Sequence, residues 1–213
     1  MPIDLETEKL DLHSVGSRFL KRTTDLLCAT TGLLALSPLL FIIYIALRWQ
    51  GDGPVFFHQE RIGRYGRPFY IHKFRTMRPD AEAQGPQLAE TDDVRLTPIG
   101  SHLRKHHLDE LPQLWNVLVG EMSMVGPRPE RRFFIEQIIK AGGDYLSILQ
   151  LRPGVTSEAT ISNGYTNTMQ KMLERLEMDR HYLATQSWWG DCCIIWRTVF
   201  LVLHGEKKKS DRP

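Results

Sequence analysis

The sequence is poor in cysteine, in net charge and in repeated segments. Cys28 stands alone and Cys192 and Cys193 are adjacent, a spacing that provides neither a CxxC motif nor a disulfide framework. We therefore expect the main domain to lie in a reducing cytoplasm. The formal net charge of +2 is too small for a nucleic-acid-binding protein, whose basic surface would dominate its field. The 213 residues are enough for one domain with a substantial core.

Charge is missing altogether from residues 26–47. As a helix this run would cover roughly 33 Å, enough for the hydrocarbon core of a bilayer, and it is longer than the apolar region of a cleavable signal peptide. The chain is therefore predicted to divide into a basic N-terminal segment (residues 1–24), a membrane helix (25–48), a cytoplasmic domain (49–205) and a basic tail (206–213).

The dipeptide Ser37-Pro38 interrupts the middle of the membrane segment. Proline there removes a backbone donor and crowds the carbonyl of Leu34, at a cost of about 3 kcal/mol in an unkinked helix. Two arrangements follow, a kinked helix that crosses the membrane once and a re-entrant hairpin that enters and returns. Basic residues flank the segment on both sides, and a straight span would place one flank outside, which favours the hairpin.

The segment after the membrane helix has the pattern of short strands followed by helices. Residues 55–59 and 68–74 are predicted to be strands on either side of the turn at 63–66, and residues 80–93 a loop or frayed helix. Thr97 is expected to cap a helix that starts at Pro98 and runs to His106, and another helix should start near Pro112. The resulting fold class is α+β, mostly helical, with a β-hairpin or extended pair.

Two adjacent carboxylates, Asp109 and Glu110, lie just ahead of the helix expected at Pro112. The positive end of the helix dipole favours their ionised forms, which suits a carboxylate nucleophile or a metal ligand. Ordinary acidity at a helix start is the alternative. A zinc site is a second alternative, because His102, His106 and Glu110 are spaced by four, although the break at Pro112 counts against it.

Six short motifs together resemble one family. They are Ser37-Pro38, Gly53-Pro54-Val55-Phe56-Phe57, Gln59-Glu60-Arg61-Ile62-Gly63, Lys73-Phe74-Arg75-Thr76-Met77, Leu108-Asp109-Glu110-Leu111-Pro112-Gln113-Leu114 and Val125-Gly126-Pro127-Arg128-Pro129. In this order and spacing the chain resembles the bacterial sugar transferases, small polyprenol-phosphate phosphoglycosyl transferases that start glycan assembly on a lipid carrier.

The resemblance implies a fold, a reaction and a place in the cell. It implies a re-entrant, monotopic helix in the bacterial inner membrane, with a catalytic domain facing the cytoplasm. Asp109 matches the nucleophile that attacks the β-phosphate of a UDP-sugar, which releases UMP and leaves an aspartyl phosphosugar. Polyprenol phosphate then takes the phosphosugar as a diphosphate-linked lipid. Glu110 matches the family's magnesium-associated carboxylate, so Mg²⁺ is the implied cofactor.

Such a reaction needs cations, because a carboxylate about 4 Å from a phosphate charge is opposed by roughly 4 kcal/mol at an effective dielectric of about 20. Arg128, stiffened by two flanking prolines, matches the family's phosphate-contacting arginine. Arg104, Lys73 and Arg75 are further candidates, with solvated surface charge as the alternative for each. Asp179 resembles an acidic residue that the family has near its site.

The C-terminal part of the sequence is less specific. Residues 152–156 resemble the family, whereas 157–164 depart from it, which leaves the transferred sugar open. Residues 188–203 are apolar but too short to span, so an interfacial helix is expected, with the lysines at 207–209 meeting anionic inner-membrane lipid and a buried core helix as the alternative. An inactive membrane scaffold and a zinc hydrolase remain rival functions, and a homodimer is one of the oligomeric states left open.

Overall fold

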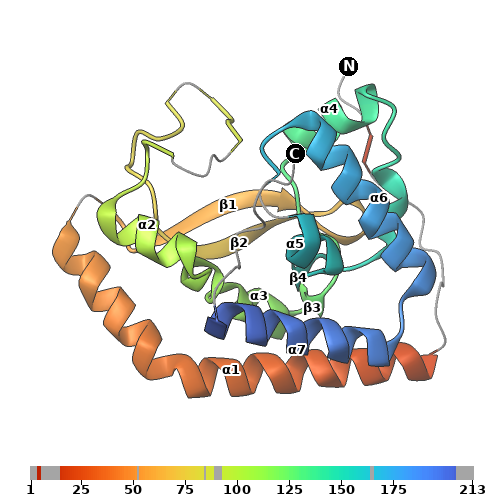
Figure 1. Ribbon diagram of the computed structural model, residues 1–213, viewed down its shortest axis with the longest axis horizontal. Helices are drawn as coiled ribbons and strands as arrows, with labels where there is room; N and C mark the ends of the chain where they lie inside the picture. The colour runs from red at the N-terminus through yellow and green to blue at the C-terminus, as the bar shows by residue number, and fades with distance from the viewer. Residues whose placement is uncertain are drawn as a thin grey trace.

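The computed structural model describes residues 4–5, 15–51, 53–83, 85–88, 93–163 and 166–204. The described chain is mostly helical with two small sheets, which confirms the predicted class (Figure 1). Its elements are α1 (Val15–Gln50), β1 (Phe56–Ile62), η1 (Arg64–Gly66), β2 (Pro68–Phe74), α2 (Pro98–Lys105), η2 (Leu108–Glu110), α3 (Gln113–Val119), β3 (Ser123–Val125), α4 (Arg132–Lys140), η3 (Leu146–Gln150), β4 (Gly154–Thr156), α5 (Glu158–Asn163), α6 (Met169–Thr185) and α7 (Trp188–His204).

Helix α1 is one long helix that contains Pro38 and changes direction along its length (Figure 1). The hydroxyl of Ser37 donates to the carbonyl of Leu34 at 2.8 Å, and Leu34 is the residue whose carbonyl loses its usual partner when proline occupies position 38. The predicted break is therefore a bend within a continuous helix. Its residues Gly16–Gln50 are long and apolar enough to cross a membrane.

The same helix begins ten residues earlier than the membrane segment expected from hydropathy, so part of the basic N-terminal segment is helical. Two of its cations are held by the rest of the protein. Lys21 Nζ lies 2.7 Å from a carboxylate oxygen of Asp191 in α7, and Arg22 donates to the carbonyls of Val117 and Leu118 at the end of α3. These contacts fasten the N-terminal part of α1 to the folded domain.

Strands β1 and β2 form the expected antiparallel hairpin, paired from Phe56 with Phe74 to Ile62 with Pro68. Its turn contains Tyr65 at φ 60°, a left-handed conformation that is uncommon for a bulky residue. Helix α3 is attached to β2 by Asn116, whose side chain accepts from the backbone N–H of His72 and donates to the carbonyl of Tyr70. The hairpin is thereby fixed against the helix that follows the two carboxylates.

A second sheet, of two parallel strands, was not predicted. Strand β3 pairs with β4 through Ser123 with Gly154 and Val125 with Thr156. Gly126 follows β3 so closely packed that a Cβ atom there would lie 2.3 Å from the carbonyl oxygen of Arg152. Glycine is therefore required at this point, and the sheet fixes where the Pro127-Arg128-Pro129 segment begins.

Local signals predicted the two helices that follow the hairpin, α2 and α3, to within a residue. The Thr97 hydroxyl accepts from the backbone N–H of Gly100 at 3.0 Å, as a cap of α2 should, and Pro112 precedes α3. Helix α2 ends at Lys105 and not at His106, because the chain turns sharply through His107 at φ 54°. That turn opens the short η2 helix on which Asp109 and Glu110 lie.

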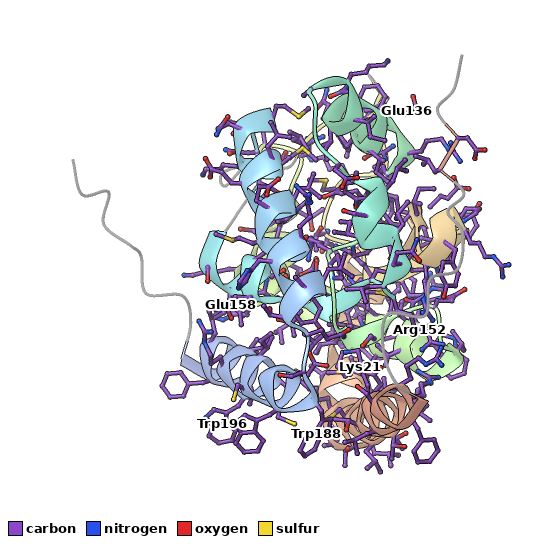
Figure 2. The ribbon with its side chains drawn as sticks, turned by 90° about the vertical axis from the view of Figure 1, so that its right-hand side faces the viewer. Lys21, Glu136, Arg152, Glu158, Trp188 and Trp196 are labelled. Carbon is purple, nitrogen blue, oxygen red and sulfur yellow. The ribbon has the colours of Figure 1, made fainter. Side chains whose placement is uncertain are left out.

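Helix α7 lies beside α1 on the same side of the molecule (Figures 1 and 2). The indole N–H of Trp188 donates to the hydroxyl of Thr24 in α1 at 2.9 Å, while Trp189 and Trp196 are exposed. Figure 2 shows Trp188 and Trp196 at the base of the molecule, where α1 also lies. This exposure favours the interfacial helix over the core helix; residues 207–209 lie outside the described part of the chain.

Candidate active site

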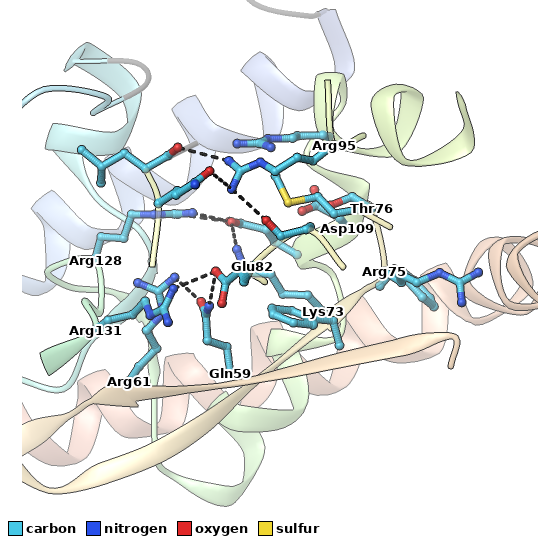
Figure 3. Close-up of a pocket in the computed structure, with 18 of the residues that line it drawn as sticks. Gln59, Arg61, Lys73, Arg75, Thr76, Glu82, Arg95, Asp109, Arg128 and Arg131 are labelled. Carbon is cyan, nitrogen blue, oxygen red and sulfur yellow. Dashed lines mark hydrogen bonds and ion pairs between the residues drawn. The ribbon is translucent and has the colours of Figure 1, made fainter. Parts of the chain in front are cut away.

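One cavity of about 600 Å³ collects most of the residues proposed from the sequence (Figure 3). The hairpin, the segment after it, η2, the Pro127-Arg128-Pro129 segment and the α5–α6 region contribute to its wall. Glu82 bridges one side of it, accepting from Gln59 at 3.3 Å and from Arg131 at 2.7 Å. Among the described residues that line it, nine are lysine or arginine and four are aspartate or glutamate. This excess of positive charge suits a ligand with several negative charges.

Asp109 and Glu110 both line this cavity, but they have different surroundings. Asp109 is 7% exposed. The carboxylate of Glu110 accepts from Lys73 Nζ at 2.6 Å and from two nitrogens of Arg128 at 2.5 and 3.2 Å. Figure 3 shows Lys73, Asp109 and Arg128 converging from the hairpin, η2 and the Pro127-Arg128-Pro129 segment. Glu110 is thus clamped by two cations from distant parts of the sequence.

The pKa values of the two carboxyl groups shift in opposite directions. Burial, together with the neighbouring Glu110 charge, raises the pKa of Asp109 above its ordinary value. Burial opposes ionisation of Glu110 as well, but the charges and hydrogen bonds of Arg128 and Lys73 outweigh it and hold that pKa well below its usual range. Ionisation was expected to be favoured for both groups; the pKa of Glu110 is lowered, but by Arg128 and Lys73, and the pKa of Asp109 is raised, with burial as the largest cause.

Lys73 and Arg128 are placed as predicted, beside the carboxylates. Burial lowers the pKa of Lys73, and the Glu110 charge partly offsets this effect. The Glu110 charge raises the pKa of Arg128, so its guanidinium remains charged. Pro127 and Pro129 fix the backbone on either side of Arg128. A permanent cation, Arg128, and a second basic group, Lys73, therefore lie next to the two acidic groups, where a phosphate would need them.

The other three predicted residues differ in position. Arg104 lines the cavity. Arg75 also lines it, but its guanidinium donates to the carbonyls of Leu47, Gly51 and Pro54 at 3.3, 2.6 and 3.0 Å, and so caps the C-terminal end of α1. Asp179 is buried in α6 and does not line the cavity, and burial raises its pKa to about 7. The structure therefore gives Arg75 a structural contact and sets Asp179 behind the wall.

A buried ionic network within the cavity wall was not found from the sequence. Glu130 accepts from Arg61 at 3.0 Å and from Arg175, and Arg175 also donates to the hydroxyl of Thr166 at 2.7 Å. Asp179 lies next to it, since the charge of Arg175 acts on its carboxyl group. The sequence held two signals for this network: Arg61 belongs to one of the six family motifs, and Glu130 directly follows another. The network holds four cavity-lining residues, Arg61, Glu130, Thr166 and Arg175, in fixed positions.

The proposed zinc ligands do not come together. The rings of His102 and His106 lie 4.8 Å apart, but Glu110 faces Lys73 and Arg128 beyond the end of α2. Within the described ranges, no group of three or more histidine, cysteine, aspartate or glutamate side chains could hold a metal ion. The zinc alternative is therefore wrong for this part of the chain. Asp109 and Glu110 still offer carboxylate oxygens, which suit Mg²⁺ when phosphate oxygens and water complete its shell.

Comparison with known proteins gave one family and several relatives. The family described as "Bacterial sugar transferase" matches residues 16–205. An Aeromonas hydrophila UDP-N-acetylgalactosamine-undecaprenyl-phosphate N-acetylgalactosaminephosphotransferase is 37% identical over 187 residues, 88% of this chain and 44% of that protein. UDP-glucose:undecaprenyl-phosphate glucose-1-phosphate transferases from Escherichia coli K12 and Caulobacter vibrioides are 40% and 38% identical, covering 86% and 84% of this chain. The chain spans 40% of the former protein's length and 68% of the latter's.

Proposed function

The chain belongs to the bacterial sugar transferase family, and on this premise we propose that it transfers a sugar-1-phosphate from a UDP-sugar to polyprenol phosphate. The names of its relatives state the substrate classes, undecaprenyl phosphate together with UDP-glucose or UDP-N-acetylgalactosamine. One observation carries the proposal: buried Asp109 lies in a cavity whose described lining has nine lysine or arginine side chains. A diphosphate needs this surplus of cations when a carboxylate attacks it.

In the first half-reaction, a carboxylate oxygen of Asp109 attacks the β-phosphorus of the UDP-sugar. An oxygen–phosphorus bond forms, the bond to the bridging oxygen breaks, and UMP leaves with the bonding electron pair. Lys73 and Arg128 are hydrogen-bonded to the adjacent Glu110. Their positive charges stabilise the negative charge that develops on the phosphate oxygens. In the second half-reaction, a phosphate oxygen of polyprenol phosphate attacks the acyl phosphate and Asp109 leaves as a carboxylate. The product is polyprenyl-diphosphate-sugar.

Mg²⁺ is proposed as the cofactor, held by Glu110 with Asp109 beside it. The donor chemistry fits, because two adjacent carboxylates can bind the ion while substrate phosphates supply further oxygens. When bound, Mg²⁺ supplies additional positive charge to the diphosphate. With or without Mg²⁺, Glu110 holds Arg128 and Lys73 in place, since both donate to its carboxylate oxygens.

The proposed placement in the membrane is monotopic, with the folded domain on the cytoplasmic face of the bacterial inner membrane. Both parts of α1 support this, because Lys21 contacts Asp191 near one end and Arg75 binds the carbonyls of Leu47 and Gly51 at the other. One folded domain cannot lie on both sides of a bilayer, so a helix fastened to it at both ends enters and returns. Tags at either terminus should then be protected from external labelling in intact cells. External labelling of residues before Arg22 would contradict this topology.

The function is tested by following UMP and the intermediate separately. Wild-type protein with polyprenol phosphate, Mg²⁺ and a panel of UDP-sugars should release UMP from one of them. Without acceptor, the peptide containing Asp109 should carry the phosphosugar mass and lose it to hydroxylamine. Asp109→Asn should abolish both signals, while Asp144→Asn, at an exposed carboxylate in the loop after α4, should retain them. Absence of UMP with every sugar would favour the inactive scaffold, and activity in Asp109→Asn would exclude Asp109 as nucleophile.

A further inference from the structure

Three aromatic rings form a row from the membrane helix to the cavity. The Tyr44 ring in α1 lies 6.2 Å from the Phe56 ring at the start of β1, and Phe56 stacks on Phe74 with their centroids 5.4 Å apart. Phe56 and Phe74 are cross-strand partners in the hairpin and both line the cavity. The row therefore joins an apolar, membrane-length helix to the wall of the proposed active site.

Phe56 presents a large apolar ring on the cavity wall and is 39% exposed, as is Tyr44. Phe57 beside it is 42% exposed and also lines the cavity. Phe74, in contrast, is only 2% exposed and packs with Ile43 and Leu47 of α1. The buried ring supports the exposed one, and Phe56 and Phe57 give the cavity wall an apolar part that adjoins Tyr44 of α1.

The hairpin that carries Phe56 and Phe57 also carries a basic residue of the proposed active site. Lys73 precedes Phe74 in β2, and its ammonium lies 2.6 Å from Glu110, the neighbour of Asp109. The described lining also has a polar side chain set that includes Gln87, Thr160 and Thr166. A molecule with an apolar chain and a phosphate end would match the sequence of surfaces from Phe56 to Lys73. A sugar or nucleoside matches the polar side chains better.

We propose that the exposed faces of Phe56 and Phe57, with Tyr44 behind them, bind the first isoprene units of the polyprenyl acceptor and direct its phosphate toward Asp109. This inference rests on the proposed function and adds the positioning residues for the acceptor. The chain of the acceptor would leave the bilayer along the C-terminal part of α1, pass over Phe56, and place its phosphate beside Lys73.

The test separates the two half-reactions. Phe56→Ala should raise the KM for polyprenol phosphate about tenfold, the effect of losing one or two buried methylene-sized contacts. UMP release without acceptor should change far less, since that step uses only the UDP-sugar. Tyr70→Ala is the matched control, because Tyr70 lies on the same hairpin, is 56% exposed and is not among the cavity-lining residues. It should leave both measurements as in the wild type.

A photoreactive acceptor gives a readout that does not depend on turnover. Polyprenyl phosphate with a diazirine in its first isoprene unit should label peptides that contain Tyr44 or Phe56. Labelling confined to α7 would overturn the inference. So would a Phe56→Ala variant with a normal KM for the acceptor and a raised KM for the UDP-sugar, which would assign the ring to the nucleoside instead. If the wild-type protein released no UMP at all, the proposed function itself would be wrong, and not only the proposed path of the acceptor chain.

Discussion

Replacing Arg128 tests whether positive charge at Glu110 is what makes the carboxylate pair reactive. Arg128 binds both oxygens of Glu110, at 2.5 and 3.2 Å, and lines the cavity with Asp109. Arg128→Ala removes the charge and both hydrogen bonds, whereas Arg128→Lys keeps the charge and loses the two-pronged contact. The two variants therefore separate charge from geometry.

The expected magnitudes follow from the charges involved. A carboxylate about 4 Å from one phosphate charge is opposed by roughly 4 kcal/mol at an effective dielectric of about 20, and one guanidinium at a similar distance offsets about that much. Arg128→Ala should then slow UMP release by up to about a thousandfold. Arg128→Lys loses one charge-assisted hydrogen bond, worth about 1.5 kcal/mol, so about a tenfold reduction is expected.

The assay is single-turnover UMP release with enzyme in excess over UDP-sugar, repeated across pH. The loss in Arg128→Ala should diminish as pH rises, because removing a nearby cation raises the pKa of Asp109 further and more base is needed to ionise it. Thermal unfolding of each variant checks that the domain is folded. Release by Arg128→Ala at the wild-type rate would refute the charge argument, and equal losses in both variants would show that geometry alone matters.

Three further changes have defined outcomes. Asp179 has a folded pKa of about 7 against an ordinary 3.8, so ionising it destabilises the fold increasingly as pH rises between these values, by up to about 4 kcal/mol. Asp179→Asn should therefore increase the free energy of urea unfolding more at pH 8 than at pH 5. A pH-independent effect would contradict this. Arg75→Met removes three hydrogen bonds to carbonyls in and just after the end of α1 and should lower the free energy of unfolding by about 3 kcal/mol. The melting temperature should fall and proteolysis near Gly51 should be faster, whereas an unchanged melting temperature would refute the capping role. Pro38→Leu restores a backbone donor and should let α1 span the membrane, exposing one terminal tag to external labelling; an unchanged topology would show that the bend does not depend on proline.

The parts of the fold that the sequence predicted are those determined within a few residues. The hairpin has its turn between two apolar runs, the α2 cap is a threonine followed by proline, and α3 starts after Pro112. Each depends on backbone angles and on one or two neighbouring side chains. Helix α1 extends beyond the membrane segment expected from hydropathy, since Lys21 and Arg22, which hydropathy excluded, are bound by partners about 95 to 170 residues away.

Long-range contacts account for what could not be predicted. The pairing of β3 with β4 joins two three-residue strands, too short to show an alternating pattern. Arg75 lies in the same motif as Lys73 and was a candidate for phosphate binding, yet its guanidinium donates to carbonyls at the end of α1. Nothing in the spacing of Glu130 and Arg175 reveals that they meet. Each of these features depends on contacts between segments that are far apart in the sequence and meet only in the folded structure.

The two carboxylates illustrate why position in a helix does not determine their chemistry. Both lie in η2, so the helix dipole acts on them alike, and local sequence predicts a common tendency to ionise. Arg128 and Lys73 approach Glu110 and leave Asp109 with burial as its largest influence. One group is therefore a fixed anion held by cations, and the other is a less solvated carboxyl group that gains nucleophilicity once ionised. A nucleophile beside a permanently charged neighbour can attack a diphosphate only where surrounding cations exceed both, and the nine basic side chains of the described cavity lining provide that excess.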